Sequence, residues 1–193
     1  MLYLIGGVPR VGKSTLANLI LERDKIAYID TDWIIHMLMF AAPQLDVKVF
    51  TKFNEQEFRN KAEKFYPFLY QFIKHNQPVV EHYVIEGDSF LPEQVSTLKK
   101  EFQLKACFLG SDKLQPETLV NNSSKNDWWI NKLNSQQLND LCKWIRNMSI
   151  FLEKECELHK IAYFDVSANY KEQIENSYRY LLSKQPHEDH GDP

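Results

Sequence analysis

The sequence has no excess of positive charge. Its 23 lysine and arginine residues are outnumbered by 26 aspartates and glutamates, and the formal net charge is −3. No basic tract occurs along the chain. Because tight binding to a phosphate backbone requires clustered lysine and arginine, we do not expect a strong nucleic-acid-binding surface.

Long apolar runs are also missing. No run approaches the roughly 18 residues of a membrane span, and Met1 leads straight into a short apolar segment without the basic and apolar regions of a signal peptide. We therefore expect a cytoplasmic protein with no membrane association. Cysteine is scarce, with three residues in total. Cys142 and Cys156 fall on one predicted helix, about 21 Å apart at 1.5 Å per residue, so they cannot form a disulfide, and we expect reduced, mostly buried thiols.

Only six glycines are present, and three of them, Gly6, Gly7 and Gly12, lie close together near the start of the chain. The segment from Gly7 to Ser14 matches the pattern G-x-x-x-x-G-K-[ST], directly after an apolar run and before a helical pattern. In this context the pattern is typical of a loop whose backbone N–H groups bind phosphate at the start of a helix. The sequence therefore predicts binding of a nucleoside triphosphate, and an ordinary strand-to-helix turn is the alternative.

The phosphate-binding pattern assigns roles to individual side chains. Lys13 is expected to reach the β- and γ-phosphates, and Ser14 is expected to hold Mg²⁺. The expected nucleotide-binding residues are Gly7, Val8, Pro9, Arg10, Val11, Gly12, Lys13, Ser14 and Thr15.

Short apolar runs alternate with helical patterns along the rest of the chain, which is typical of an α/β fold with a parallel sheet. At 193 residues we expect one domain over residues 1–184, followed by a polar, disordered tail at 185–193. The predicted strands are Leu2–Ile5, Ile26–Ile29, Tyr83–Ile85, Leu104–Leu109 and Ala162–Phe164. The predicted helices are Ser14–Arg23, Trp33–Phe40, one from Asn54 that Pro67 kinks or splits, Pro92–Lys100, Ser135–Lys160 and Tyr170–Leu182.

Acidic residues follow two of the predicted strands, Asp30 and Asp32 after the second and Glu86 and Asp88 after the third. Ligands of open α/β sheets bind beyond the carboxyl ends of the strands, so these carboxylates are candidates for a site. Phosphoryl transfer to an alcohol requires Mg²⁺ at the phosphates and a carboxylate at the attacking hydroxyl. We expect Asp32 to be that carboxylate and Asp30 and Glu86 to hold Mg²⁺ with Ser14.

Each of these acidic residues also has a simpler interpretation. Asp32 is equally suited to capping the helix predicted from Trp33. Glu86 or Asp88 is suited to starting a turn before Pro92.

Three segments carry a resemblance to a known family: the loop Gly6–Thr15, the Asp-x-Asp after the second strand, and Tyr83–Gly87 before a helix that begins with proline. Together they resemble small P-loop kinases with an adenylate-kinase-like core, in particular the 2-phosphoglycerate kinase, polynucleotide kinase and zeta-toxin group. The resemblance implies a three-layer α/β/α P-loop NTPase fold whose five-stranded parallel sheet has the order 2-3-1-4-5. It also implies a helical cap at about 41–78 and a lid at about 110–134.

The sequence departs from this family in two places. Arg10 stands where many relatives have glycine, and it either adds a cation at the phosphates or points to solvent. The lid region 110–134 contains no arginine; its cations are Lys113, Lys125 and Lys132. Arg146, on the helix after the lid, is the candidate catalytic arginine, with a surface ion pair as the alternative.

Trp128 and Trp129 also fall in the lid region, and they either stack on a ligand base or fix the lid to the core.

The sequence as a whole predicts an ATP- and Mg²⁺-dependent kinase that phosphorylates a hydroxyl of a small molecule, with Lys13, Asp32 and Arg146 as catalytic residues. A module that binds or hydrolyses ATP without kinase activity is the alternative, because the lid lacks arginine. A zeta-toxin-like kinase is also open. The acceptor and the oligomeric state are not predicted.

Overall fold

The structure, a computed structural model, describes residues 1–49, 54–121 and 130–183. Within these residues five parallel strands form one sheet in the order β2-β3-β1-β4-β5, which confirms the predicted order. The strands are β1 (Leu2–Gly7), β2 (Tyr28–Asp30), β3 (Tyr83–Glu86), β4 (Leu104–Gly110) and β5 (Ala162–Asp165).

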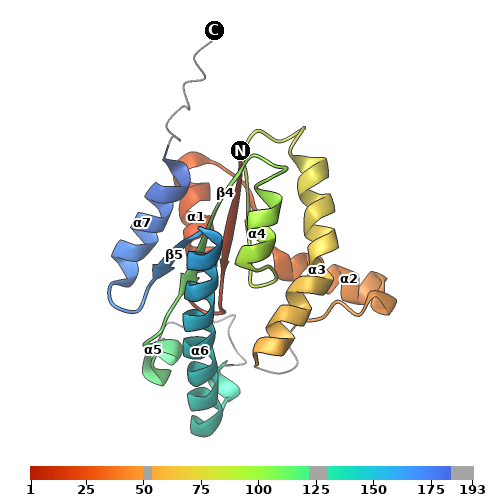
Figure 1. The fold of residues 1–193 in the computed structure, drawn as a ribbon. Coiled ribbons are helices and arrows are strands. Elements are labelled where there is room, and N and C mark those ends of the chain that lie inside the picture. Colours follow the sequence, from red (N-terminus) through yellow and green to blue (C-terminus); the bar gives the residue numbers. More distant parts are fainter. Residues whose placement is uncertain (50–53, 122–129, 184–193) are drawn as a thin grey trace.

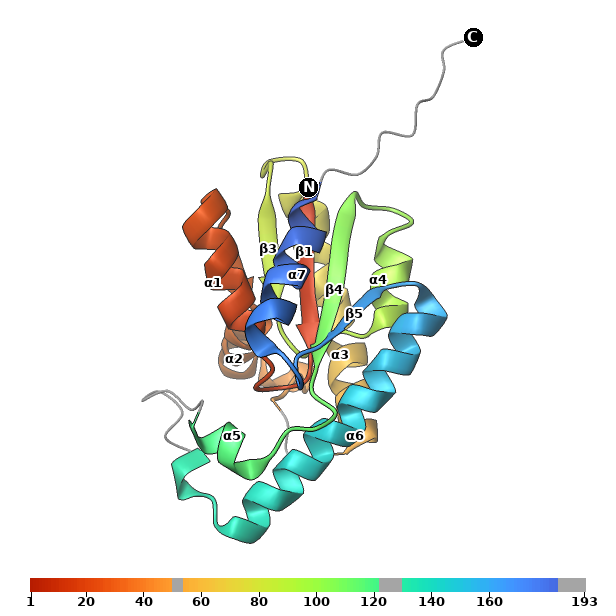
Figure 2. The same ribbon diagram turned by 90° about the vertical axis from the view of Figure 1, so that its left-hand side faces the viewer.

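Helices cover both faces of the sheet, as the two views show (Figures 1 and 2). Helices α1 and α7 lie on one face, and α3, α4 and α6 lie on the other, so the fold has the predicted three layers. The helices are α1 (Lys13–Asp24), α2 (Thr31–Ala41), α3 (Glu55–Asn76), α4 (Pro92–Leu98), α5 (Pro116–Asn121), α6 (Ser135–His159) and α7 (Tyr170–Leu182), with short 3₁₀ turns η1 (Pro43–Leu45) and η2 (Ile130–Lys132).

The two central strands, β1 and β4, are buried along their whole length. A parallel strand that is covered by helices on both faces has no side that faces water, so its sequence is continuously apolar rather than alternating. The runs Leu2–Ile5 and Ala106–Leu109 have this composition. This pattern is the physical reason why the central strands could be located from the sequence.

The junction between β2 and α2 differs from the prediction. The strand extends to Asp30, and the helix begins at Thr31, two residues before the predicted start at Trp33. The Asp30 carboxylate accepts a hydrogen bond from the Asp32 backbone N–H at 2.8 Å. Asp30 is therefore the N-cap of α2, and the expectation that Asp32 caps this helix is wrong.

Helix α3 forms the main part of the expected cap. Its N-cap is Asn54, whose side chain accepts from the Glu57 N–H, as the sequence predicts. The helix continues through Pro67, so the split that was one of the two expectations at this proline does not occur. Figure 1 shows the axis of α3 changing direction along its length.

All three cysteines are free and buried, as expected. None of the described helices is long and apolar enough to cross a membrane. The predicted tail, 185–193, lies outside the described residues.

Candidate phosphoryl-transfer site

The phosphate-binding loop joins β1 to α1, and glycine is required at both of its ends. Gly7 has a φ of +140°, and a Cβ there would lie 2.2 Å from the carbonyl oxygen of Leu109. Gly12 has a φ of +95°, and a Cβ there would lie 2.4 Å from the Tyr170 hydroxyl oxygen. Gly12 is the N-cap of α1 and has no side-chain cap, so the first amides of this helix are available to a phosphate.

Arg10 lies in the middle of this loop and also has a left-handed backbone, with a φ of 70°. Such a conformation is uncommon for a residue with a side chain, and it is frequent in loops that aim backbone N–H groups at an anion. The Nη2 atom of Arg10 is buried, so the expectation that the side chain simply points to solvent is wrong. Its proposed contact with a phosphate stays a prediction.

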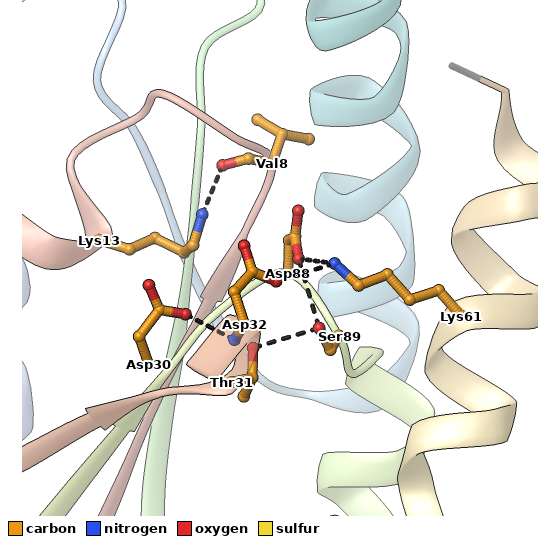
Figure 3. A network of polar contacts seen from close by, with 8 residues as sticks. All are labelled: Val8, Lys13, Asp30, Thr31, Asp32, Lys61, Asp88 and Ser89. Atoms are coloured by element: carbon orange, nitrogen blue, oxygen red, sulfur yellow. Dashed lines mark hydrogen bonds and ion pairs between the residues drawn. The ribbon is translucent and has the colours of Figure 1, made fainter. Parts of the chain in front are cut away.

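Lys13 and Ser14 follow the loop and face the interior of the site. The Lys13 ammonium group donates to the backbone carbonyl of Val8 at 2.9 Å, and the lysine as a whole is 8% exposed (Figure 3). The Ser14 hydroxyl donates to a Glu86 carboxylate oxygen at 2.6 Å. The predicted metal-binding serine therefore meets the acidic end of β3, and the Lys13 charge acts on the same carboxylate.

The sheet register brings the acidic residues together. Asp30 at the end of β2 is paired with Glu86 at the end of β3, and Glu86 is in turn paired with Ile5 in β1, just before the loop. Glu86 and Asp88 are buried, whereas the Asp32 side chain is 43% exposed. All four predicted carboxylates therefore lie at the carboxyl edge of the sheet beside the phosphate-binding loop.

Burial changes the acidity of two of these carboxyl groups, Glu86 and Asp30. It raises the pKa of Glu86 to about 7; the neighbouring Asp30 charge adds to this rise, and Lys13 and the hydrogen bond from Ser14 oppose it. Burial also raises the pKa of Asp30, with the Asp32 N–H hydrogen bond opposing. Burial disfavours the ionised form of a carboxyl group, and a divalent cation bound beside the group favours the ionised form.

Lys61 of α3 is a site residue that the sequence reasoning missed. Its ammonium group lies 2.5 Å from an Asp88 carboxylate oxygen and 3.2 Å from an Asp32 carboxylate oxygen, and its side chain is 3% exposed (Figure 3). Burial acts to lower the pKa of Lys61, but the charges of Asp88 and Asp32 outweigh it and raise this pKa. Burial likewise opposes ionisation of Asp88, and the Lys61 and Lys13 charges hold the pKa of Asp88 below its usual value.

A signal for Lys61 was present in the sequence. The apolar stripe of α3 consists of residues spaced by three and four positions, and Lys61 occupies a position of that stripe between Phe58 and Phe65. A lysine on the buried face of a helix requires a carboxylate partner. Tracing that requirement would have pointed to the acidic cluster.

Two further contacts hold the acidic segments in place. The Thr31 hydroxyl donates to the Ser89 hydroxyl oxygen at 3.1 Å, which joins the start of α2 to the segment after β3 (Figure 3). A Cβ on Gly87 would lie 1.8 Å from the Thr31 hydroxyl oxygen, so only glycine allows this close approach. The Asp30–Asp32 and Glu86–Asp88 segments are thereby packed against each other.

The structure does not bring Arg146 to these carboxylates by any contact. Its guanidinium group donates to the backbone carbonyl of Leu114 at 3.1 Å and so ties α6 to the segment after β4. Lys113 and Lys132 are exposed. Lys125, Trp128 and Trp129 lie outside the described residues.

The charges of the site fit a bound magnesium ion. Lys13 and Lys61 contribute two positive charges, against four carboxyl groups at the same edge of the sheet. Mg²⁺ binds through one or two carboxylates, a hydroxyl group, waters and substrate phosphates. Ser14, Glu86 and Asp30 provide that set of protein oxygens.

The five-stranded parallel sheet in the order 2-3-1-4-5, with helices on both faces and a phosphate-binding-type loop after β1, defines the fold class of this chain as three-layer α/β/α. No family model matches the sequence, and no curated protein is detectably similar to it. The evidence for the class therefore comes from three-dimensional structure.

Several solved structures are similar in fold to nearly the whole of this chain. A gluconokinase from Sinorhizobium meliloti 1021 has 14% sequence identity and a TM-score of 0.53, with 93% of this chain and 90% of that chain covered. A shikimate kinase from Bacteroides thetaiotaomicron has 16% identity and a TM-score of 0.52, with 94% and 96% covered. An uncharacterized protein from Eubacterium ventriosum has 14% identity and a TM-score of 0.51, with 95% and 99% covered.

Proposed function

We propose that this protein is an ATP- and Mg²⁺-dependent kinase that transfers the γ-phosphoryl group to a hydroxyl of a small molecule. The observation that carries this proposal is that Ser14 bonds to Glu86, on which the Lys13 charge acts, at the same edge of the sheet as the Asp30–Asp32 segment. The similarity in fold to a gluconokinase and a shikimate kinase supports the reaction class.

In the proposed reaction the acceptor hydroxyl oxygen attacks the γ-phosphorus, the bond between this phosphorus and the bridging oxygen breaks, and ADP leaves. Lys13 exchanges its hydrogen bond to the Val8 carbonyl for one to the β- and γ-phosphates. Asp32 accepts the proton of the acceptor hydroxyl, because its side chain is 43% exposed whereas Glu86 and Asp88 are buried. Ser14, Glu86 and Asp30 would hold Mg²⁺, which would supply positive charge to neutralise the phosphates.

Within the P-loop kinases we propose a relationship to the 2-phosphoglycerate kinase, polynucleotide kinase and zeta-toxin group. The Asp-x-Asp at the start of α2 and the acidic end of β3 support it.

The test combines nucleotide binding with a screen for the acceptor. Calorimetry should detect ATP binding that strengthens with Mg²⁺, and a pool of metabolites incubated with ATP should contain a product heavier by one phosphoryl group. The matched control is Asp32→Asn, which keeps the size of the side chain and removes the base. ATP binding without any product that exceeds this control would instead indicate a module that binds or hydrolyses ATP.

A further inference from the structure

Helices α4 and α6 lie side by side on one face of the sheet (Figures 1 and 2). Glu93 lies in the first turn of α4, and Glu155 and His159 lie near the end of α6. Each of these three side chains places one ligand atom, a carboxylate oxygen or an imidazole nitrogen, within 4.8 Å of the other two. The proposed kinase reaction uses none of the three, so their convergence is a separate feature of the molecule.

The two residues on α6 are brought together by their spacing. Residues four positions apart on a helix lie on the same side of it. The His159 Nε2 atom lies 3.8 Å from one carboxylate oxygen of Glu155, and the two side chains are 27% and 20% exposed. Tetrahedral zinc ligands, each about 2.0–2.2 Å from the metal, lie roughly 3.4 Å apart. The three ligand atoms therefore need to approach one another by about 1 Å, which the broad terminal torsion of glutamate allows.

Glu93 is presented to α6 by a fixed backbone. The next residue, Gln94, is buried, and its side-chain amide donates to the Ala62 carbonyl of α3 at 3.1 Å. The Gln94 side-chain oxygen accepts from the Leu91 N–H at 3.0 Å, at the start of α4. These bonds hold α4 against α3 and fix its first turn. A ligand set on fixed backbones loses little conformational freedom when an ion binds.

Negative charge is in excess around these ligands. The Arg59 guanidinium of α3 lies 3.6 Å from the other carboxylate oxygen of Glu155 and 4.5 Å from the centre of the Phe151 ring. Arg59 also donates to Glu55 at 3.0 Å. Burial acts to lower the pKa of Arg59, but the hydrogen bond to Glu55 and the charges of Glu155 and Glu93 outweigh it and raise this pKa. Within the described ranges, Arg59 is the one lysine or arginine paired with these three glutamates, so the group keeps an excess of negative charge that a divalent cation balances.

The imidazole determines which kind of ion fits. Mg²⁺ and Ca²⁺ bind through oxygen ligands, whereas a nitrogen ligand favours Zn²⁺ and related transition metals. His159 therefore separates this group from a plain cluster of acidic side chains. One nitrogen and two carboxylate oxygens match the three-ligand zinc sites whose fourth position is taken by water.

We propose that Glu93, Glu155 and His159 form a binding site for Zn²⁺ or a similar transition-metal ion, which clamps α4 to α6. Arg59 supports the site from outside the ligand set, by pairing with the second oxygen of Glu155. This inference goes beyond the proposed function and does not rest on it, because none of the three ligands belongs to the phosphoryl-transfer site.

The experiment titrates the full chain with Zn²⁺ by calorimetry, after a chelator has removed any bound metal. We expect the wild type to have a Zn²⁺ site with which Mg²⁺ at the same concentration does not compete. His159→Gln and Glu93→Gln should each weaken this binding by at least about tenfold, because losing a residue that only supports a metal ligand already costs about 10–100-fold. Thermal unfolding of the wild type at a hundredfold excess of Zn²⁺ over Kd should rise by on the order of 5 °C, and that of His159→Gln should not.

Two control variants locate the ion. His75→Gln should bind Zn²⁺ like the wild type, because His75 is an exposed histidine in the last turn of another helix, α3. Glu86→Gln should also retain this Zn²⁺ binding, and a loss confined to Glu86→Gln would place the zinc in the phosphoryl-transfer site and overturn the proposal. Circular dichroism without metal checks that each variant is folded.

The remaining outcomes also decide the question. No Zn²⁺ binding by the wild type, or equal binding by the wild type, His159→Gln and Glu93→Gln, would overturn the proposal. A loss in His75→Gln as large as that in His159→Gln would show unspecific binding to histidine. A loss in His159→Gln without one in Glu93→Gln would remove the clamp between the two helices. Failure of the proposed function would instead appear as an absence of ATP binding, with the Zn²⁺ titrations unchanged.

Discussion

The two sides of the site are built differently. The proposed nucleotide side consists of consecutive residues, from Gly7 through Ser14, whose backbone would make the binding surface. The proposed acceptor side combines Asp32, Lys61 and Asp88, which come from three separate segments and meet through side chains. A local backbone motif is visible in a sequence, whereas a site of converging side chains depends on the fold.

Two carboxylates of the site also differ in exposure. Glu86 is 2% exposed and accepts a hydrogen bond from Ser14, while the Asp32 side chain is 43% exposed at the edge of the cluster. Electrostatic interactions between buried charges are strong, and those between exposed charges are screened by water. Glu86 is therefore suited to the proposed role of holding a metal, and Asp32 is suited to the proposed exchange of protons.

The largest expected effect tests the assignment of the acceptor side. Asp32→Asn should lower phosphoryl transfer by roughly 10²–10⁴-fold while ATP still binds, because the base is lost and the phosphate-binding loop is not touched. Transfer kinetics and calorimetry on the same variant measure both. Near-normal transfer by Asp32→Asn, together with an inactive Asp30→Asn, would exchange the roles of the two aspartates.

Lys13→Ala tests the nucleotide side. We expect ATP affinity to fall by roughly 10–100-fold, the worth of a charged hydrogen bond, and transfer to fall by roughly 10²–10³-fold. The free energy of unfolding should fall by only about 1 kcal/mol, because among the described residues the Lys13 side chain donates to a single carbonyl, that of Val8. Calorimetry and thermal unfolding check these values. Unchanged affinity and unchanged turnover would refute the loop assignment.

The pKa of Glu86 predicts a pH dependence that is confined to the nucleotide side. The folded protein holds a proton on Glu86 up to about pH 7, whereas the unfolded chain releases it near pH 4.5. The raised pKa therefore costs stability as pH rises from about 4.5 to 7, by on the order of 3 kcal/mol in total. Urea unfolding across this range should show Glu86→Gln gaining stability relative to wild type as the pH rises.

Magnesium binding should depend on the same proton of Glu86, but Mg²⁺ affinity should rise with pH where the stability of the protein falls. Mg²⁺ requires the ionised carboxylate, so Mg²⁺ affinity in the presence of ATP should fall by up to about tenfold per pH unit below pH 7. Glu86→Gln should bind Mg²⁺ more weakly and without this slope. A wild-type affinity that is constant between pH 5.5 and 8 would remove Glu86 from the metal site.

The smallest expected effect concerns the link between α6 and the segment after β4. Arg146→Met should lower kcat by about tenfold or less and leave ATP affinity unchanged, since a contact made only in the transition state affects turnover. Lys143→Met, an exposed position on the same helix, is the control. Equal losses in kcat and ATP affinity would mean that Arg146 serves ground-state binding, and no loss would leave only its contact with the Leu114 carbonyl.

The start of α2 shows how far sequence reasoning reached and where it stopped. The acidic residues at the ends of β2 and β3 were located correctly, because parallel strands end at a common edge. The capping residue of α2 was not identified, because both Asp30 and Asp32 have side chains suited to capping. The extended backbone of Asp30, with φ −85° and ψ 130° before the first helical turn, makes Asp30 the N-cap.

The sequence by itself determined the phosphate-binding loop and the central strands. Both are local: glycines at defined spacing set the backbone of the loop, and full burial requires continuous apolar residues in β1 and β4. The tertiary structure alone decided that Lys61 meets Asp32 and Asp88, and that Lys48 and Lys64 share Asp46. These contacts join residues up to 29 positions apart, and only the packing of α3 beside the sheet brings their side chains within bonding distance.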